Sequence, residues 1–303
     1  MDQRLKDFRN FLFLAWDHLG LPDPTPIQYD IADYIQNGPK RRCVMAFRGV
    51  GKSWITSAFV CHQLLLDPTK NILVVSASKQ RADDFSTFTL RLISEMEILN
   101  HLKPNETQRN SKIAFDVGPA PASHAPSVTS KGITSQITGA RADLIIADDV
   151  ESLNNSATQM MRDKLGAAVQ EFDAVLKPDG HVIYLGTPQS EQSLYNELPD
   201  RGYDVKIWPA RKPNEKQVVG YGSRLAPKIV AMDLEEGEPT DPKRFNTFDL
   251  MEREASYGRS GFALQFMLDT SLSDADRYPL KLSDLIVMRL DAENAPEKVV
   301  WAG

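Results

Sequence analysis

The sequence contains few of the residues that build disulfide frameworks and metal clusters. Its 303 residues include two cysteines and five histidines. Two cysteines are too few for a disulfide-rich scaffold, and the histidines are too scattered along the chain to complete a zinc site with them. We therefore expect Cys43 and Cys61 to be small buried hydrophobic residues.

Long hydrophobic runs are also missing. No segment approaches the roughly 18 to 20 apolar residues of a membrane-spanning helix, and the first residues, Met-Asp-Gln-Arg-Leu-Lys, lack the apolar core of a secretion signal. We therefore expect a soluble, cytoplasmic protein that has no membrane partner. The formal net charge of −6 predicts that any contact with DNA is local. Basic residues cluster at 40–42 and around 79–81, although most such clusters are simply solvated surface.

The most informative segment that is present is a phosphate-binding loop. Residues 46–53 read Ala-Phe-Arg-Gly-Val-Gly-Lys-Ser, which is the Walker A pattern with Ala46 in place of the first glycine. Apolar residues 43–45 predict a strand before the loop, and a helical pattern follows over 52–66. This strand–loop–helix context favours a nucleotide-binding loop over an ordinary glycine-rich turn.

Each residue of the loop has an expected role toward a nucleoside triphosphate. Gly49, Val50 and Gly51 are expected to curl so that their N–H groups face a phosphate, at the positive end of the following helix. Lys52 is expected to reach the β- and γ-phosphates. The Ser53 hydroxyl is expected to bind Mg²⁺ together with a carboxylate from elsewhere in the sheet.

The rest of the chain alternates between predicted helices and strands, as in an α/β fold with a mostly parallel sheet. The expected helices cover 4–19, 26–36, 52–66, 80–98, a segment from about 155, 249–257 and 260–267. The expected strands lie within 43–45, 72–76, 112–117, 127–133, 143–151, 181–188 and 205–208, and residues 118–126 form an irregular loop, either a surface excursion or a partner contact. The pattern loosens after residue 210, which predicts a core over 1–210 and a small subdomain over 211–303.

A second functional segment lies at 143–151, which reads Asp-Leu-Ile-Ile-Ala-Asp-Asp-Val-Glu. A buried parallel strand that ends in acids carries carboxylates to the edge of the sheet where ligands bind. Asp148 is the expected second Mg²⁺ ligand. Asp149 is the favoured residue to polarise the attacking water, and Glu151 is the competing choice. The alternative is that these acids only form a turn and cap the next helix.

Segment 181–188 is another apolar strand, and it ends in Gly-Thr-Pro. If it lies beside the strand of Asp148, the Thr187 hydroxyl faces the γ-phosphate or the attacking water, where it can sense hydrolysis. By itself Gly-Thr-Pro is only a turn.

The order and spacing of four segments resemble the ATPase part of bacteriophage terminase large subunits, most closely those of short-tailed phages. The segments are Pro-Thr-Pro-Ile-Gln at 24–28, the loop at 46–53, Gly-Ala-Arg-Ala-Asp-Leu-Ile-Ile-Ala-Asp-Asp at 139–149 and Tyr-Leu-Gly-Thr-Pro at 184–188. The resemblance extends through Ile-Trp-Pro-Ala at 207–210 and Gly-Phe-Ala-Leu-Gln-Phe at 261–266.

This resemblance implies an ASCE/RecA-like P-loop NTPase with a small C-terminal lid or linker subdomain. It implies Mg²⁺-dependent ATP hydrolysis that drives double-stranded viral DNA into a procapsid in the host-cell cytoplasm. The implied partners are the portal protein, the small terminase subunit and other copies of the chain, which form a ring, a pentamer when assembled, from subunits that can be monomers in isolation.

The resemblance also implies roles for individual residues. Gln28 matches the glutamine that recognises the adenine edge, and Lys52 and Ser53 match the phosphate and Mg²⁺ contacts. Asp148 and Asp149 match the Walker B pair. Many relatives have Glu at the second of these positions, and the shorter Asp side chain keeps Glu151 in contention as the general base.

Three further residues complete the expected site. Thr187 falls in the motif that couples hydrolysis to movement, and Arg48 matches an arginine that contacts the γ-phosphate. Arg141 is our choice for the arginine that one subunit offers to its neighbour's nucleotide.

The family also carries an RNase H-like nuclease domain. Residues 270–303 include four aspartates but no long β-rich segment to arrange them, so we expect no nuclease domain and no DNA cleavage from this sequence; the four are Asp274, Asp276, Asp284 and Asp291. Two other functions stay open. A helicase would need a second motor domain of similar size, and a non-hydrolysing switch would show a guanine-reading Asn-Lys-x-Asp segment or lack a water-activating acid.

Overall fold

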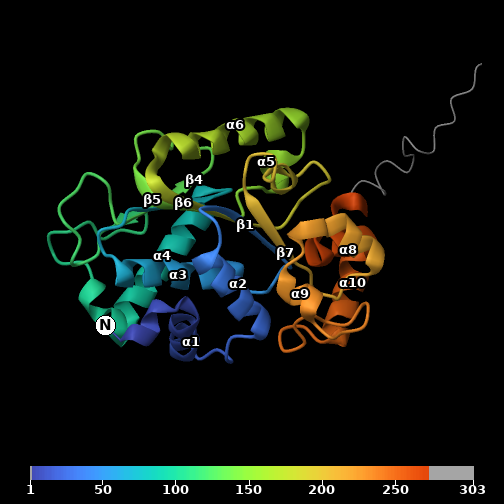
Figure 1. Ribbon diagram of the computed structural model, residues 1–303. Coiled ribbons are helices and arrows are strands. Elements are labelled where there is room, and N and C mark those ends of the chain that lie inside the picture. The colour runs from blue at the N-terminus through green and yellow to red at the C-terminus, as the bar shows by residue number, and fades with distance from the viewer. Residues whose placement is uncertain (1, 273–303) are drawn as a thin grey trace, which may run out of the picture.

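The computed structural model describes residues 2–272, which form a seven-stranded sheet between layers of helices (Figure 1). The strand order is β3-β4-β2-β5-β6-β1-β7, and every neighbouring pair is parallel except the antiparallel pair β3 and β4. The strands are β1 (Arg41–Ala46), β2 (Ile72–Ser76), β3 (Ala114–Phe115), β4 (Val128–Gly132), β5 (Ala142–Asp148), β6 (Leu176–Gly186) and β7 (Asp204–Trp208).

Helices cover both faces of this sheet. Figure 1 shows α1 to α4 on one face, α6 on the other, and α8 to α10 beside the edge strand β7. The helices are α1 (Phe8–His18), α2 (Pro26–Asn37), α3 (Lys52–Leu66), α4 (Lys79–Glu95), α5 (Leu153–Ser156), α6 (Gln159–Val175), α7 (Leu194–Glu197), α8 (Glu215–Tyr221), α9 (Pro227–Ala231) and α10 (Thr247–Phe262). Short 3₁₀ turns (Gln3–Lys6, Glu97–Leu102, Gly222–Arg224, Thr270–Leu272) and one π-helical turn (Ala263–Met267) complete the described elements.

The position of β6 confirms the predicted fold class. This strand lies between β1, which leads into the phosphate-binding loop, and β5, which ends in the aspartates. Leu185 of β6 pairs with Val44 on one side and with Asp148 on the other. Insertion of one strand between the two nucleotide-binding strands is the arrangement expected of an ASCE/RecA-like P-loop NTPase. It brings the loop, Asp148 and the end of β6 to one edge of the sheet.

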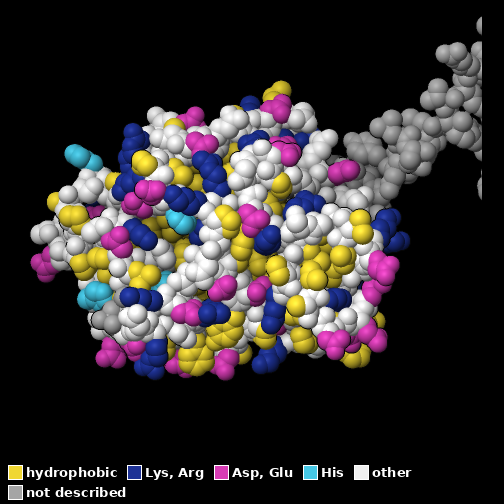
Figure 2. Space-filling view, viewed as in Figure 1, with side chains coloured by type: hydrophobic (Ala, Val, Ile, Leu, Met, Phe, Trp, Pro, Cys, Tyr) yellow, Lys and Arg dark blue, Asp and Glu magenta, His cyan; other side chains and the backbone are white. Residues whose placement is uncertain are grey.

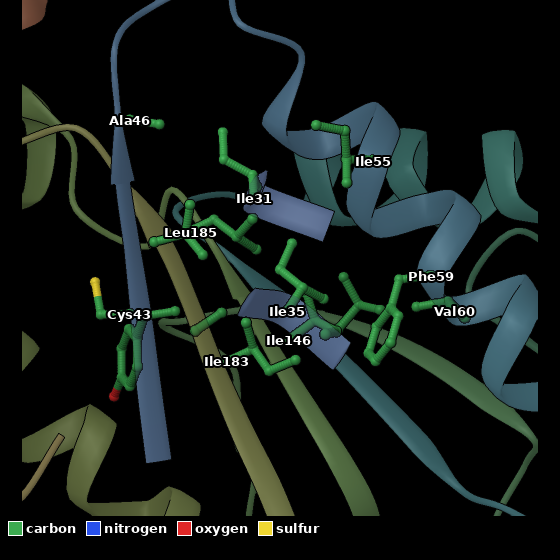
Figure 3. Close-up of a cluster of buried hydrophobic side chains, with 14 of the residues drawn as sticks. Ile31, Ile35, Cys43, Ala46, Ile55, Phe59, Val60, Ile146, Ile183 and Leu185 are labelled. Atoms are coloured by element: carbon green, nitrogen blue, oxygen red, sulfur yellow. The ribbon is translucent and has the colours of Figure 1, made fainter. Parts of the chain in front are cut away.

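Burial on both faces explains the continuous apolar strands. All five residues of β2 and nearly all of β5 are buried, as parallel strands between helical layers require. Figure 3 shows Ile146 and Ile183 of the sheet packed with Ile35 of α2 and Phe59 of α3. Cys43 and Cys61 are free and buried, as expected.

Some element bounds differ from the predicted ones. The expected first helix is interrupted at Asp7, whose carboxylate accepts a 2.9 Å hydrogen bond from the backbone N–H of Arg9 and so caps α1. The strand expected at 112–117 is reduced to the two residues of β3, which lies at the edge of the sheet and pairs there with β4. Helix α10 is kinked at Gly258, where φ is 69°, which separates the two helices predicted there.

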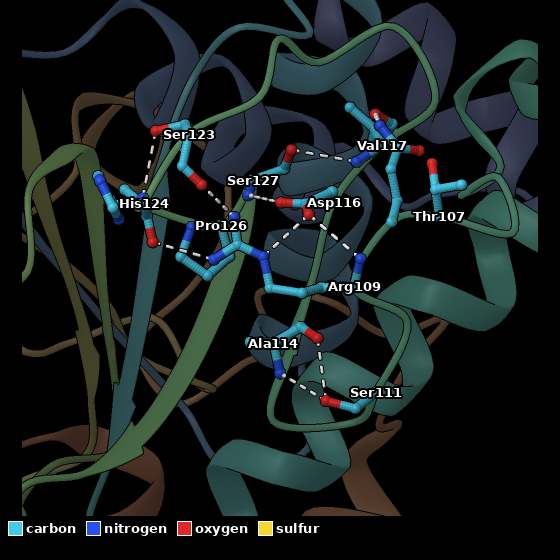
Figure 4. Close-up of polar contacts among 12 residues, drawn as sticks. Thr107, Arg109, Ser111, Ala114, Asp116, Val117, Ser123, His124, Pro126 and Ser127 are labelled. Atoms are coloured by element: carbon cyan, nitrogen blue, oxygen red, sulfur yellow. Dashed lines mark hydrogen bonds and ion pairs between the residues drawn. The ribbon is translucent and has the colours of Figure 1, made fainter.

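The irregular loop at 118–126 is held by Arg109 (Figure 4). The Arg109 guanidinium donates to the Asp116 carboxylate at 2.9 Å and to the backbone oxygens of Ser123 and His124. The other oxygen of Asp116 accepts from the Ser127 N–H at 3.3 Å. One arginine and one aspartate therefore fix both ends of this surface loop.

The surface carries charges of both signs. Figure 2 shows basic and acidic side chains interspersed over the visible face. Within residues 2–272, no helix combines the length and the hydrophobicity needed to cross a bilayer. The four aspartates that were weighed as possible nuclease residues, Asp274, Asp276, Asp284 and Asp291, lie outside the described residues.

Candidate nucleotide-binding site

The loop between β1 and α3 has the backbone shape that the sequence predicts. Gly49 and Gly51 have φ of 92° and 94°, a left-handed conformation that glycine adopts with little strain. Gly51 is the N-cap of α3, so the positive end of a 15-residue helix faces the loop. A Cβ atom on Gly49 would lie 2.7 Å from the Phe245 ring, which leaves no space for a side chain.

Lys52 spans the loop from inside. Its Nζ donates to the backbone oxygen of Ala46 at 2.7 Å and to Thr187 Oγ1 at 3.2 Å. Burial lowers the pKa of Lys52, while the nearby carboxylates of Asp149 and Asp148 act in the opposite direction. The ammonium group is thus already positioned between the loop and the end of β6.

Ser53 and Asp148 form the pair that suits a magnesium ion. Ser53 Oγ lies 3.0 Å from each carboxylate oxygen of Asp148. Burial, and next the charge of Asp149, raise the pKa of Asp148 to about 7. One hydroxyl and one carboxylate match the small number of protein oxygens that Mg²⁺ uses beside phosphates and water. The residues present therefore fit the ion, whose charge would favour the ionised carboxylate.

Asp149, directly after β5, has an unusual backbone conformation. Its φ of 46° lies in the left-handed region, which aspartate and asparagine tolerate better than most residues. The Asp149 N–H still donates to the Leu185 oxygen at 2.9 Å, so the ladder to β6 is kept. Its side chain is 36% exposed and lies 3.9 Å from the Arg81 guanidinium. Asp149 is therefore a carboxylate that water can reach.

Glu151 is placed quite differently. Its side chain is buried and accepts hydrogen bonds from the Gln189 N–H (3.0 Å), the Ser193 hydroxyl (3.0 Å) and the Leu194 N–H (2.6 Å). Burial raises the pKa of Glu151, and these three hydrogen bonds counteract the rise. The carboxylate thus joins the end of β5 to the segment that follows Thr187.

Two cavities meet at the loop. The larger, of about 530 Å³, is lined by residues that include Arg48, Lys52, Ser53, Arg81, Asp149 and Thr187. The smaller, of about 270 Å³, is lined by residues that include Trp16, Leu21, Gln28 and Arg244. Gly51 and Trp54 line both cavities. The first has polar groups for a triphosphate, and the second has the flat apolar side chains that suit a nucleobase.

Gln28 lies at the smaller cavity with both ends of its amide in use. Its Nε2 donates to the Val50 oxygen at 2.8 Å, and its Oε1 accepts from the Thr25 N–H at 3.0 Å. The same residue thus completes the capping box of α2 and supports the phosphate-binding loop.

Residues after 210 also contact the loop. Arg48 donates from Nη1 to Gln265 Oε1 at 3.1 Å and from its backbone N–H to the Gln265 oxygen at 3.0 Å. Arg244 Nε donates to the Gly49 oxygen at 2.8 Å. The loop is therefore held by the C-terminal part of the chain as well as by the sheet.

Arg141 is the one predicted residue that lies far from the others. It is exposed and precedes β5, at the opposite end of the strand from Asp148. Seven residues of extended chain separate these two positions by roughly 20 Å. Its guanidinium donates to the backbone oxygens of Ala140 and Ala174.

Two basic residues at the site were missed from the sequence, Arg81 and Arg244. We considered Arg81 only as part of a local basic cluster. A usable signal was its position five residues after the end of β2, because the carboxyl ends of parallel strands share one edge. Arg244 had no comparable signal, since it lies in a loop 195 residues beyond Gly49.

The comparisons with known proteins agree with this geometry. Residues 43–167 match the family described as "Terminase large subunit, T4likevirus-type, N-terminal". The chain is 53% identical over 305 residues to the large terminase subunit of Enterobacteria phage T3, a match that covers 97% of this chain and 52% of that protein. The chain therefore spans about half the length of this curated relative.

Two solved structures show the same fold at low sequence identity. The large terminase ATPase domain of Thermus phage P74-26 matches with a TM-score of 0.50 and 15% identity, over 84% of this chain and 96% of that one. The large terminase of bacteriophage HK97 matches with a TM-score of 0.52 and 13% identity, over 88% of this chain and 55% of that one. With the Walker segments assembled as described, the chain is similar to bacteriophage terminase large subunits, and residues 43–167 match the N-terminal model of that family.

Proposed function

We propose that this chain is the Mg²⁺-dependent ATPase of a terminase large subunit and that its hydrolysis of ATP drives double-stranded viral DNA into a procapsid. The observation that carries the proposal is the meeting of the two Walker segments at Ser53 and Asp148, beside a cavity that also holds Lys52 and Asp149. The 53% identity to a phage terminase supports it independently.

Each protein group has its own contact with the triphosphate. The N–H groups of Gly49, Val50 and Gly51 bind the β-phosphate, and Lys52 contacts the β- and γ-phosphates. Ser53 and Asp148 would hold Mg²⁺, which neutralises charge on the phosphate oxygens.

Asp149 and Glu151 both line the larger cavity, but the Asp149 side chain is 36% exposed, whereas Glu151 is buried and its carboxylate already accepts from three donors. Asp149 therefore orients the attacking water and accepts its proton. Arg48 leaves Gln265 and contacts the γ-phosphate. Thr187 senses hydrolysis through its contact with Lys52 Nζ. The base occupies the smaller cavity, against Gln28.

The wider assembly is part of the same proposal. The division into an ATPase core over 1–210 and a lid or linker subdomain over 211–303 stays part of the proposal, and residues 273–303 lie outside the described part of the chain. Copies form a ring, a pentamer when assembled, on the portal in the host cytoplasm, together with the small terminase subunit. In this proposal, Arg141, which is exposed and distant from the site of its own chain, acts on the nucleotide of a neighbouring subunit. Within residues 2–272, no three acidic, histidine or cysteine side chains are placed to share a metal ion. The expectation that this sequence cleaves no DNA stays a prediction.

Phosphate release from Mg-ATP tests the ATPase. The wild-type chain should hydrolyse ATP, and Lys52→Ala should not. The control is Lys70→Ala, in the turn between α3 and β2, which should hydrolyse ATP as the wild type does. Undiminished hydrolysis by Lys52→Ala would remove the loop assignment. ATP binding without any hydrolysis by the wild type would instead favour a switch.

DNA assays separate the motor functions. Capsid filling by the assembled protein without strand displacement is expected. Strand displacement without filling would favour the helicase alternative.

A further inference from the structure

We propose that Arg81 is a positioning residue that directs the Asp149 carboxylate toward the attacking water. The inference rests on the proposed ATPase function and adds a residue to it. Arg81 Nη1 lies 3.9 Å from Asp149 Oδ2, and both side chains line the larger cavity. Arg81 belongs to α4, which follows β2, whereas Asp149 follows β5, the strand paired with β2.

The start of α4 is held firmly enough to aim a side chain. Ser78 caps the helix, and its hydroxyl accepts from the Arg81 N–H at 3.3 Å. A Cβ atom on Gly132 of β4 would lie 2.7 Å from the Lys79 nitrogen, so strand and helix backbones are in close contact. The position of the first turn is therefore set by the sheet.

Of the two basic residues in this turn, only Arg81 faces the cavity. Lys79 donates to the buried Asp83, which also accepts from the Ser130 hydroxyl at 3.1 Å. Lys79 is thus used to anchor the helix on β4. Arg81, by contrast, lines the cavity with Asp149.

Asp149 needs such a partner more than Glu151 does. Within residues 2–272, Arg81 provides the only ion pair to the Asp149 carboxylate, whereas three donors fix that of Glu151. The separation of 3.9 Å exceeds a hydrogen bond. Arg81 therefore orients the carboxylate through its charge and leaves the oxygen lone pairs available to a water molecule.

A positioning role predicts a specific kinetic pattern. Arg81→Gln should lower kcat for ATP hydrolysis by roughly 10- to 100-fold, the cost of a misplaced reacting group. The dissociation constant of a fluorescent ATP analogue should stay within about threefold, because the phosphate contacts are unchanged. Arg81→Lys should retain an intermediate kcat, and ethylguanidinium should partly restore Arg81→Ala.

The matched control is Arg91→Gln, on the same helix. Arg91 pairs with Glu95 on the exposed surface and does not line the cavity, so its loss should leave kcat within about twofold. The free energy of unfolding in urea should be close to the wild-type value for all variants, since an exposed ion pair adds little to stability.

Three results would overturn the inference. Weaker analogue binding at unchanged kcat would make Arg81 a phosphate-binding residue. If Arg81→Gln kept the basal kcat but lost only an increase of ATP hydrolysis on addition of DNA, Arg81 would be a DNA contact. Unchanged kinetics with an active wild type would refute only this inference, whereas a wild type that releases no phosphate would refute the proposed function as well.

Discussion

The choice between Asp149 and Glu151 can be decided by one pair of substitutions. The structure predicts opposite outcomes for Asp149→Asn and Glu151→Ala. Asn fits the left-handed backbone of residue 149 and has nearly the same shape, so the fold should tolerate it. Glu151→Ala removes the carboxylate that accepts three hydrogen bonds, at a residue that is 2% exposed.

The expected magnitudes follow from these contacts. In Glu151→Ala, the N–H groups of Gln189 and Leu194 and the hydroxyl of Ser193 lose their acceptor. Each unsatisfied buried N–H costs about 1–3 kcal/mol, and removal of a buried carboxylate offsets part of this. We expect the free energy of unfolding to fall by about 3 kcal/mol. Asp149→Asn loses only an exposed ion pair, so the corresponding change should be below about 1 kcal/mol.

Hydrolysis should show the reverse order. Loss of a general base typically costs roughly 10²- to 10⁴-fold in rate, which is the fall in kcat expected for Asp149→Asn. Glu151→Ala should retain more activity than Asp149→Asn at temperatures where it is folded. The measurements are urea unfolding followed by circular dichroism and phosphate release at saturating Mg-ATP. The reasoning would be refuted if Glu151→Ala were as stable as the wild type and lost more kcat than Asp149→Asn. Glu151 would then be the general base.

Two further predictions concern Thr187 and Arg141. Thr187→Val removes the hydroxyl 3.2 Å from Lys52 Nζ, so kcat should fall about tenfold, the equivalent of one hydrogen bond, with ATP affinity nearly unchanged; a proportional loss of affinity would make Thr187 a ground-state contact. If Arg141 acts on a neighbour, specific activity should rise with protein concentration in the wild type and stay low in Arg141→Ala, as measured by phosphate release across a dilution series. A flat wild-type profile would argue against this role.

Local patterns were enough to predict the buried central strands and the phosphate-binding loop. The apolar runs of β2 and β5 reflect burial on both faces, a property that each strand carries in its own residues. Gly49 and Gly51 similarly predicted their positive φ angles, because a curled phosphate-binding loop needs them. The break at Asp7 was missed, because the helix was predicted over 4–19, although aspartate before an apolar periodic segment is a common N-cap.

The remaining features depend on partners distant in the chain. The Arg48–Gln265 contact joins residues 217 positions apart, and the burial of Glu151 depends on a segment about 40 residues later. The placement of β6 between β1 and β5 likewise needs the three-dimensional order of the strands. No periodicity in the sequence encodes these neighbours, which is why Glu151 could not be separated from Asp149.

The most direct test is a crystal structure of this chain with Mg²⁺ and a non-hydrolysable ATP analogue. The account predicts the β-phosphate within the N–H groups of 49–51, the metal between Ser53 and Asp148, and the Asp149 carboxylate behind the γ-phosphate. An analogue bound elsewhere would contradict the account. So would an analogue bound at the loop with the Asp149 carboxylate turned away from the nucleotide.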